Sequence, residues 1–497
     1  MKFNKIIINS LIVLGLGLSS CDDLERFPTD EISIDDSFES INDARAWNNG
    51  MYANLRANVY GNRMFTQDVQ ADQVNASLTY GNRNGAPHRW LPFLADAGII
   101  EDYWFGAYQG IADINLAIEN FDNIETADAT EAGELNAFKG EAHLARAYYY
   151  HRLVVRYAKM YDPASAATDL GVPLVLQFDL TEKPSRNTVE EVYTQILNDI
   201  AEAKTLLAGV NGASGAIKFN IDVAKALEAR VLFYKQDYAN AKTVAEELIN
   251  SGNYPLITTE AQLRNMWTND FHQEVISSLF VSAPNELGRA NNIYLGLIAA
   301  TGNYAPDFIP SQWVVDAYED ADFRKNIYFE QKDVEQENIV YPDIWLVNKY
   351  PGNPALFTGA NSNFQHAPIL FRIAEMYLIS AESDLNGGLG DPLVRLNQLR
   401  QARNASMLTG LSGTGLQDAV RMERFRELAF EGFRLDDLRR WNLGITRRDP
   451  QNTTLLQTGT QFDQLTQPAG ADKFTWGIPT RDLTVNPNLR DQQNPGW

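Results

Sequence analysis

The stretch from Pro368 to Trp441 constrains the fold more than any other part of the sequence. Its first predicted helix begins at Pro368, has apolar residues at three- and four-residue steps as far as Leu385, and ends at a Gly-Gly pair. A second helix is predicted after Asp391-Pro392, and a turn rich in Gly, Ser and Thr at 409–415 precedes a third. Because each helix has an apolar face to bury, the sequence predicts helices packed in antiparallel pairs.

Three glutamates recur at steps of four on the third predicted helix: Glu423, Glu427 and Glu431. Carboxylates on one helical stripe repel one another unless cations lie nearby. Arginines of the same block can supply these cations, namely Arg400, Arg403, Arg424, Arg426, Arg434, Arg439 and Arg440. We therefore expect interhelical ion pairs, with a paired-carboxylate active site as the less favoured alternative.

Four runs in this block carry a family resemblance: Phe371–Glu382, Leu396–Arg403, Glu423–Arg434 and Asp437–Trp441. They resemble the carboxyl-terminal signature of the SusD/RagB family of outer-membrane nutrient-binding lipoproteins. The closing segments Gly477–Pro479, Asn486–Leu489 and Gln493–Trp497 also resemble this family, although its chains more often end in Tyr than in Trp. The run Lys139–Tyr150 resembles the family as well.

This resemblance implies a fold dominated by α-helices, with about four tetratricopeptide-like helical pairs, loop-rich insertions and a few short strands. It implies a surface lipoprotein that captures an oligo- or polysaccharide and delivers it to a SusC-like TonB-dependent outer-membrane transporter. The alternative is a RagB-like importer component that captures peptides, and a third interpretation is a scaffold without a ligand. We expect no cofactor and no enzymatic activity.

The amino terminus has the features of an export signal. Lys2 and Lys5 precede an apolar run from Ile6 to Leu18, which is too short to span a bilayer. Cys21 follows Leu-Ser-Ser and resembles the acylated first residue of a bacterial lipoprotein. We expect a signal peptide at 1–20, a lipid-anchored tether at 21–35, and a protein held on the cell-surface face of the outer membrane.

Charge and cysteine content exclude several other classes of function. The net charge of −22 argues against nucleic acid as a partner and is compatible with a neutral ligand. Since Cys21 is the only cysteine, no intramolecular disulfide can form and the fold must depend on its core. No further stretch is apolar enough to cross a membrane.

Two regions of the mature chain are expected. Residues 36–250 form an amino-terminal helical region, with helices near 40–58, 104–123, 131–157 and 187–207 and a helical hairpin at 221–250. Residues 251–497 form the carboxyl-terminal region, in which a loop-rich insertion at 251–367 precedes the helical block 368–441. In the insertion, Glu274–Ala283 is predicted to be a buried strand. The tryptophans Trp267, Trp345 and Trp476 are expected in the core.

The segment 60–102 is the main candidate for the ligand site. It shows no sustained period, so it reads as a long ligand loop, and such loops tend to be functional. Its aromatic residues Trp90 and Tyr80 can stack on sugar rings, while its polar residues can bind hydroxyl groups; these are Asp72, Asn75, Arg83 and Arg89. The alternative is that Trp90 and Tyr80 only pin the loop to the body. Tyr294 and Tyr304, in a second loop-rich stretch at 285–304, complete the candidate glycan-binding set.

No sequence motif indicates catalysis or a metal. The chain lacks Gly-x-Ser-x-Gly, His-Glu-x-x-His, phosphate-loop and Cys/His-cluster patterns. His143 and His151 lie two turns apart on one predicted helix without a third ligand, so we expect them to be satisfied polar neighbours in place of zinc ligands. Glycoside hydrolysis needs only two carboxylates and stays open on sequence grounds. No loop has a spacing that specifies calcium.

Overall fold

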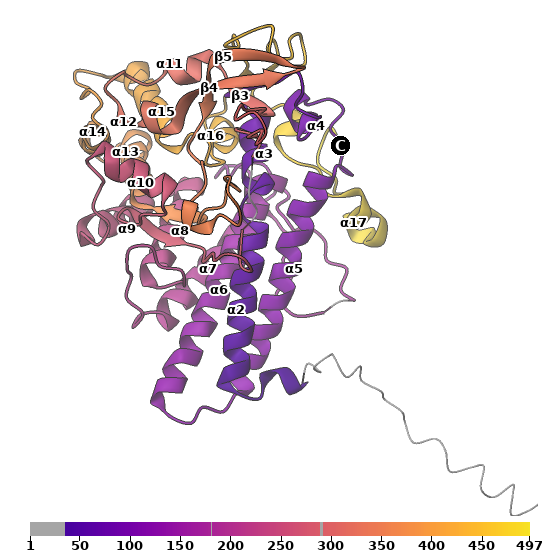
Figure 1. The fold of residues 1–497 in the computed structure, drawn as a ribbon. Helices are drawn as coiled ribbons and strands as arrows, with labels where there is room; N and C mark the ends of the chain where they lie inside the picture. The colour runs from indigo at the N-terminus through magenta and orange to yellow at the C-terminus, as the bar shows by residue number, and fades with distance from the viewer. Residues whose placement is uncertain (1–34, 180, 289–291) are drawn as a thin grey trace, which may run out of the picture.

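A computed structural model describes residues 35–179, 181–288 and 292–497. The predicted signal peptide at 1–20, the lipidation site Cys21 and nearly all of the tether lie outside these residues. Long helices of the amino-terminal half run side by side along the lower part of the molecule in Figure 1, and shorter helices and strands of the carboxyl-terminal half lie above them. The predicted class, dominated by helices with few short strands, is confirmed.

Six helices make up the amino-terminal stack. They are α2 (Ile41–Asn58), α5 (Gly98–Asn120), α6 (Ala129–Tyr157), α7 (Val189–Leu206), α8 (Ile221–Tyr234) and α9 (Tyr238–Ser251). Asp128 caps α6 and Thr188 forms a capping box with Glu191 at the start of α7. Alanines on α6, such as Ala145 with no exposed surface, allow the neighbouring helices to approach closely. Each helix packs on the next along the chain, as in tetratricopeptide repeats.

The carboxyl-terminal block contains α13 (Ile373–Gly387), α14 (Leu393–Ala402), α15 (Gly413–Leu428) and α16 (Arg434–Arg440). The predicted start of its first helix at Pro368 is wrong. Residues Ile369–Arg372 form strand β6, which pairs antiparallel with β2 (Val275–Ser278). This pairing is a long-range contact that helical periodicity alone cannot reveal. The predicted strand at 274–283 is confirmed over the four residues of β2.

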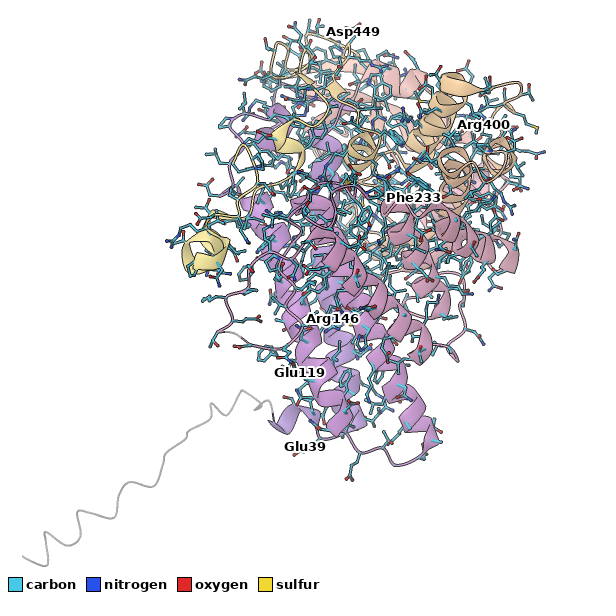
Figure 2. All side chains as sticks on the ribbon, turned by 180° about the vertical axis from the view of Figure 1, so that it is seen from behind. Glu39, Glu119, Arg146, Phe233, Arg400 and Asp449 are labelled. Carbon is cyan, nitrogen blue, oxygen red and sulfur yellow. The ribbon has the colours of Figure 1, made fainter. Side chains whose placement is uncertain are left out.

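The predicted interhelical ion pairs are confirmed for Glu423 and Glu427. Arg324 and Arg400 bind Glu423 at 2.7 and 2.5 Å, and Arg403 binds Glu427 at 2.8 Å. Figure 2 shows Arg400 among the carboxyl-terminal helices, far from Arg146 in the amino-terminal stack. Glu431 differs from the prediction, because α15 ends at Leu428 and Phe430 takes a positive φ of 63°.

Glu431 still joins the same network. It accepts hydrogen bonds from Arg372 at 2.6 Å and from Lys349 at 2.7 Å. Burial alone would raise the pKa of Glu427, but Arg403, Arg372 and Arg324 hold the pKa of its carboxyl well below the usual value. We call Glu423, Glu427, Glu431 and the cations that bind them the buried ion network.

Short elements connect the two halves. The strands form antiparallel pairs of β1 (Val74–Ala76) with β3 (Phe308–Pro310), β4 (Phe329–Gln336) with β5 (Ile339–Val347), and β7 (Ile445–Thr446) with β8 (Thr466–Gln467). Four short helices also lie in this part of the chain: α10 (Glu260–Thr268), α11 (Gln312–Asp316), α12 (Phe323–Tyr328) and α17 (Thr480–Val485). Val74 lies opposite Pro310, so the segment 60–102 is fixed against the insertion 251–367.

The prediction that 60–102 is a structureless loop is wrong. It contains α3 (Asn62–Gln70), β1, α4 (Gly85–Arg89) and the start of α5. Helix α3 is buried over most of its circumference, including the polar side chains of Thr66, Asp68 and Gln70. Helix α3 has only nine residues, with Met64, Phe65 and Val69 as its apolar side chains, so it is too short to show a sustained helical period in the sequence.

Candidate ligand-binding site

A polar cleft of about 300 Å³ opens within the candidate segment. Its walls come from the start of α3, the turn before α4 and the start of α5. The polar lining residues are Asn62, Arg63, Asn82, Asn84 and Asp102, and the remaining lining residues are small or apolar. We call this space the asparagine cleft.

The backbone of the turn before α4 shapes the cleft. Gly81, Asn82 and Asn84 all take the left-handed conformation, with φ between 53° and 64°. Asparagine tolerates this conformation better than other residues with a side chain, which explains the Asn-rich sequence of this turn. At Gly85 an added Cβ would lie 2.1 Å from the Asn82 side-chain oxygen, so only glycine lets the turn close against α4.

Hydrogen bonds fix the two asparagines of the turn. Asn82 Oδ1 accepts from Tyr80 at 3.3 Å and from Arg89 at 2.7 Å, which leaves the Asn82 amide nitrogen to act as a donor. Asn84 Oδ1 accepts from Thr66 at 3.1 Å. Asn84 Nδ2 is buried and has no hydrogen-bond partner among the described residues. Since buried donors are normally satisfied, an unsatisfied donor in the wall of a cleft favours a ligand there.

Three of the predicted site residues lie around this cleft. Tyr80 and Arg89 support Asn82, and the Arg89 guanidinium also donates to the Tyr80 hydroxyl. Arg83 belongs to the same turn and forms an ion pair with Asp307 at 2.6 Å, with about half of its side chain exposed. The ring of Tyr80 is only 8% exposed and packs against Phe308 and Phe462.

Trp90 does not present an open face for stacking, which corrects that expectation. Its side chain is 1% exposed, its ring packs on Phe474 with centroids 4.8 Å apart, and its indole nitrogen donates to the Gln70 carbonyl at 2.9 Å. The structure therefore favours the alternative, in which Trp90 pins the segment to the body. Tyr80 pins the same segment through its buried ring.

The other predicted site residues lie apart from the cleft. Asp72 is buried and ion-paired with Arg434 at 2.7 Å, and Asn75 is buried on β1, where it accepts from Ser311 at 2.6 Å. Tyr294 is 3% exposed and packs edge-on against Phe430. Tyr304 is half-buried beside β4, with the Lys332 ammonium 5.3 Å from its ring. The structure thus does not bring the predicted set together as one surface.

Trp313 is a further half-buried aromatic residue, on α11. One face of its ring stacks on Phe425 at 4.9 Å, and the guanidinium of Arg448 lies 4.7 Å from the ring centroid. The backbone nitrogen of its neighbour Gln312 donates to the Asp449 carbonyl at 3.4 Å, and Figure 2 shows Asp449 at the upper edge of the molecule. Trp267 and Trp476 are in the core as expected, whereas Trp345 is only half-buried.

Among the described residues, no group of three His, Cys, Asp or Glu side chains could hold a metal ion, and no helix is long and apolar enough to cross a membrane. His143 contacts Asp199 at 3.0 Å, as expected of a satisfied neighbour. His151 is buried, but its Nε2 atom has no hydrogen-bond partner in the described part of the chain.

Two family models match this chain. One, described as the SusD family, matches residues 322–497, and the other, described as starch-binding associating with outer membrane, matches residues 24–233. Together they cover more than three quarters of the sequence. The chain belongs to the SusD/RagB family.

Similar proteins of the SusD type agree with this assignment. SusD-like protein P38 of Formosa agariphila is 27% identical over 98% of both chains, and SusD-like protein P2 of the same organism is 25% identical over the whole of both. The crystal structure of a SusD superfamily protein from Bacteroides thetaiotaomicron matches with a TM-score of 0.78 and 25% identity, covering 92% of this chain and all of that one. A putative sugar binding protein from Bacteroides vulgatus shares the fold, with a TM-score of 0.76 and 24% identity over 93% and 99%.

Proposed function

We propose that this SusD-type protein captures an oligo- or polysaccharide at the cell surface and delivers it to a SusC-like TonB-dependent transporter. Family membership supports this proposal, as do the starch-binding character of the family model that matches residues 24–233 and the similarity to a putative sugar binding protein from Bacteroides vulgatus. The protein binds and does not transform its ligand. Acylated Cys21, the first residue after the predicted signal peptide, anchors it in the outer membrane.

The asparagine cleft is the proposed contact site for the glycan. The observation that supports this placement is the buried amide nitrogen of Asn84, a residue that lines the cleft, since this donor has no hydrogen-bond partner among the described residues. Beside it, the amide of Asn82 offers a second donor and Asp102 offers acceptor oxygens. Donors and acceptors at fixed positions can bind the paired hydroxyl groups of a sugar ring, each of which both donates and accepts.

Trp313 is a second contact in this proposal. A half-buried indole ring can place its apolar surface against the carbon face of a sugar. Its position, stacked on Phe425 and with the Arg448 guanidinium over the ring, keeps the ring rigid. A long glycan can contact both the cleft and this ring, whereas a monosaccharide can reach only one.

Native affinity electrophoresis tests the proposal. The soluble form that begins at Asp22 is run through gels that contain plant, algal, fungal or microbial polysaccharides. The variant Asn84→Gly removes the side-chain amide and keeps the left-handed backbone, and Asn338→Gly makes the same change at a positive φ of 64° in the exposed β4–β5 turn. We expect one polysaccharide to retard the unaltered protein and Asn338→Gly, and to retard Asn84→Gly much less.

Other outcomes would change the proposal in defined ways. Equal retardation of all three proteins keeps glycan capture and removes the asparagine cleft as its site. Free migration in every gel, together with binding to a peptide mixture in the same buffer, supports the peptide-importing alternative. Free migration without peptide binding contradicts capture of either ligand.

A further inference from the structure

A cavity of about 120 Å³ lies between the amino-terminal stack and the carboxyl-terminal block. Residues of α3, α6 and α8 line it, together with residues around β6 and the turn between α15 and α16. Its charged lining consists of Arg63, Arg152, Arg230, Arg372, Glu375, Glu431 and Asp436. Arg63 also lines the asparagine cleft, so its side chain lies between the two spaces.

The carboxylates of the cavity are all matched by cations. Glu375 binds Arg230 at 2.6 Å, and Glu431 binds Arg372 at 2.6 Å and also Lys349. Asp436 binds Arg156 at 2.6 Å. These pairs neutralise one another, so they leave no carboxylate of the lining as a counter-ion for a further cation.

Arg152 is a cation of the lining that has no carboxylate partner among the described residues. Its guanidinium donates to the Tyr103 hydroxyl at 3.1 Å, to the Asn58 carbonyl at 3.1 Å and to the Arg63 carbonyl at 3.4 Å, all of which are neutral acceptors. No described carboxylate lies within 4.0 Å of it. The charges that act on its pKa, besides burial, come from tyrosines. A guanidinium in a cavity without a counter-ion is a binding site for an oxyanion, whose oxygens match its planar fork.

His151 adds an independent observation. The residue is 5% exposed and lines the cavity, its ring lies 5.1 Å from that of Tyr234, and its buried Nε2 atom has no hydrogen-bond partner in the described part of the chain. Burial and the charges of Arg230 and Arg152 lower its pKa to about 3, so the ring is neutral. With its proton on Nε2, the neutral ring can donate to the same oxyanion as Arg152.

We propose that this cavity binds a small oxyanion, held by the guanidinium of Arg152 and by Nε2 of His151. A water molecule needs roughly 10–15 Å³ of such space, so the cavity can hold a sulfate- or phosphate-sized ion together with waters. The ligand is either an inorganic oxyanion or a small organic carboxylate. Bound there, it joins the two halves of the protein from the inside and stabilises them without contacting the glycan.

Crystallography with selenate tests the proposal on the unaltered protein. Selenate replaces sulfate and gives anomalous scattering, and we expect a selenium peak inside the cavity within about 4 Å of the Arg152 guanidinium. Ordered waters alone in the cavity, or selenium peaks only at the surface, would overturn the proposal. This result decides the question even if the variants below do not fold.

Thermal denaturation with added salts identifies the source of the ligand and its contacts. At matched ionic strength we expect saturable stabilisation by sulfate or phosphate, or by acetate if the ligand is a carboxylate, and none by chloride. Arg152→Met should bind the effective ion roughly tenfold to a hundredfold more weakly, since charge-assisted hydrogen bonds contribute that much. Arg490→Met, at an exposed arginine near the carboxyl end, should bind it as the unaltered protein does. Equal stabilisation of both variants would also overturn the proposal.

Discussion

The buried ion network and the asparagine cleft both contain many polar side chains, but these side chains are buried and ion-paired in the network and partly exposed in the cleft. In the network, Glu427 is fully buried and contacts Arg324, Arg372 and Arg403. In the cleft, the side-chain nitrogen of Asn84 has no hydrogen-bond partner among the described residues, and the neighbouring residues of the turn are partly exposed. The comparison shows that polar groups paired with one another stabilise the fold of this protein, whereas polar groups at a cleft are available to bind a ligand.

Removing Glu427 should have the largest effect. Glu427→Ala leaves three buried arginines without their shared carboxylate, which should cost about 4–5 kcal/mol in the free energy of unfolding. Denaturant titration measures the loss, and Glu202→Ala, at an exposed position on α7, should stay near the unaltered value. A loss below about 1 kcal/mol for Glu427→Ala would show that the network does not hold the block together.

Trp90→Ala tests whether the stability of the protein also depends on a buried side chain in the segment that forms the cleft. Because the ring is buried and its indole nitrogen is bonded, we expect a cost of roughly 3–4 kcal/mol. Under conditions where the variant stays folded, it should bind glycan nearly as well as the unaltered protein. If Trp90→Ala kept full stability and lost glycan binding, Trp90 would be a contact residue and the reading of the structure would be wrong.

Asp68 on α3 is a buried carboxyl without an ion-pair partner among the described residues. Its protonation makes the stability of the protein depend on pH, which extends the comparison. Burial raises its pKa to about 8, and Asp68 Oδ2 accepts from the Gly432 backbone nitrogen at 3.0 Å. The folded state then holds a proton that the unfolded state, with an ordinary pKa near 3.8, has released. This contribution to stability is therefore complete below pH 3.8 and is lost as the pH rises towards 8.

Asp68→Asn should remove that pH dependence. At pH 8 we expect the variant to be more stable than the unaltered protein by on the order of 2 kcal/mol, with a smaller difference at pH 5. Denaturant titrations at the two pH values measure this. A difference that does not change with pH would mean that Asp68 is ionised in the folded protein.

The sequence predicted the helical stack and the ion pairs because both follow from local spacing. Helices such as α6 and α8 have strong caps and apolar periods, and Glu423 and Glu427 lie one turn apart on a single helix. Strand β6 was missed because its partner β2 lies about ninety residues earlier in the chain. Helix α3 was missed because its nine residues are too few to show a sustained period and most of its buried side chains are polar or charged.

The sequence identified the segment that contains the candidate site but not the residues that line it. An Asn- and Gly-rich stretch marked the turn that forms the cleft, yet aromatic type alone could not show that Trp90 points inward and that Trp313 stays half-exposed. Asn82 and Asn84 were overlooked as site residues. Their signal was present in Tyr80-Gly-Asn-Arg-Asn-Gly85, where asparagines alternate in a way that suits left-handed backbone.

Isothermal titration of an oligosaccharide from the retarding polysaccharide tests the central claim most directly. The claim predicts that Asn84→Gly raises Kd about tenfold, as expected for one lost hydrogen bond at a desolvated donor, while Asn338→Gly leaves Kd unchanged. Trp313→Ala should weaken binding less when the oligosaccharide is too short to reach both contacts. The claim would be contradicted if Asn84→Gly bound as tightly as the unaltered protein while Trp313→Ala abolished binding, since the glycan would then lie at the upper edge and not in the asparagine cleft.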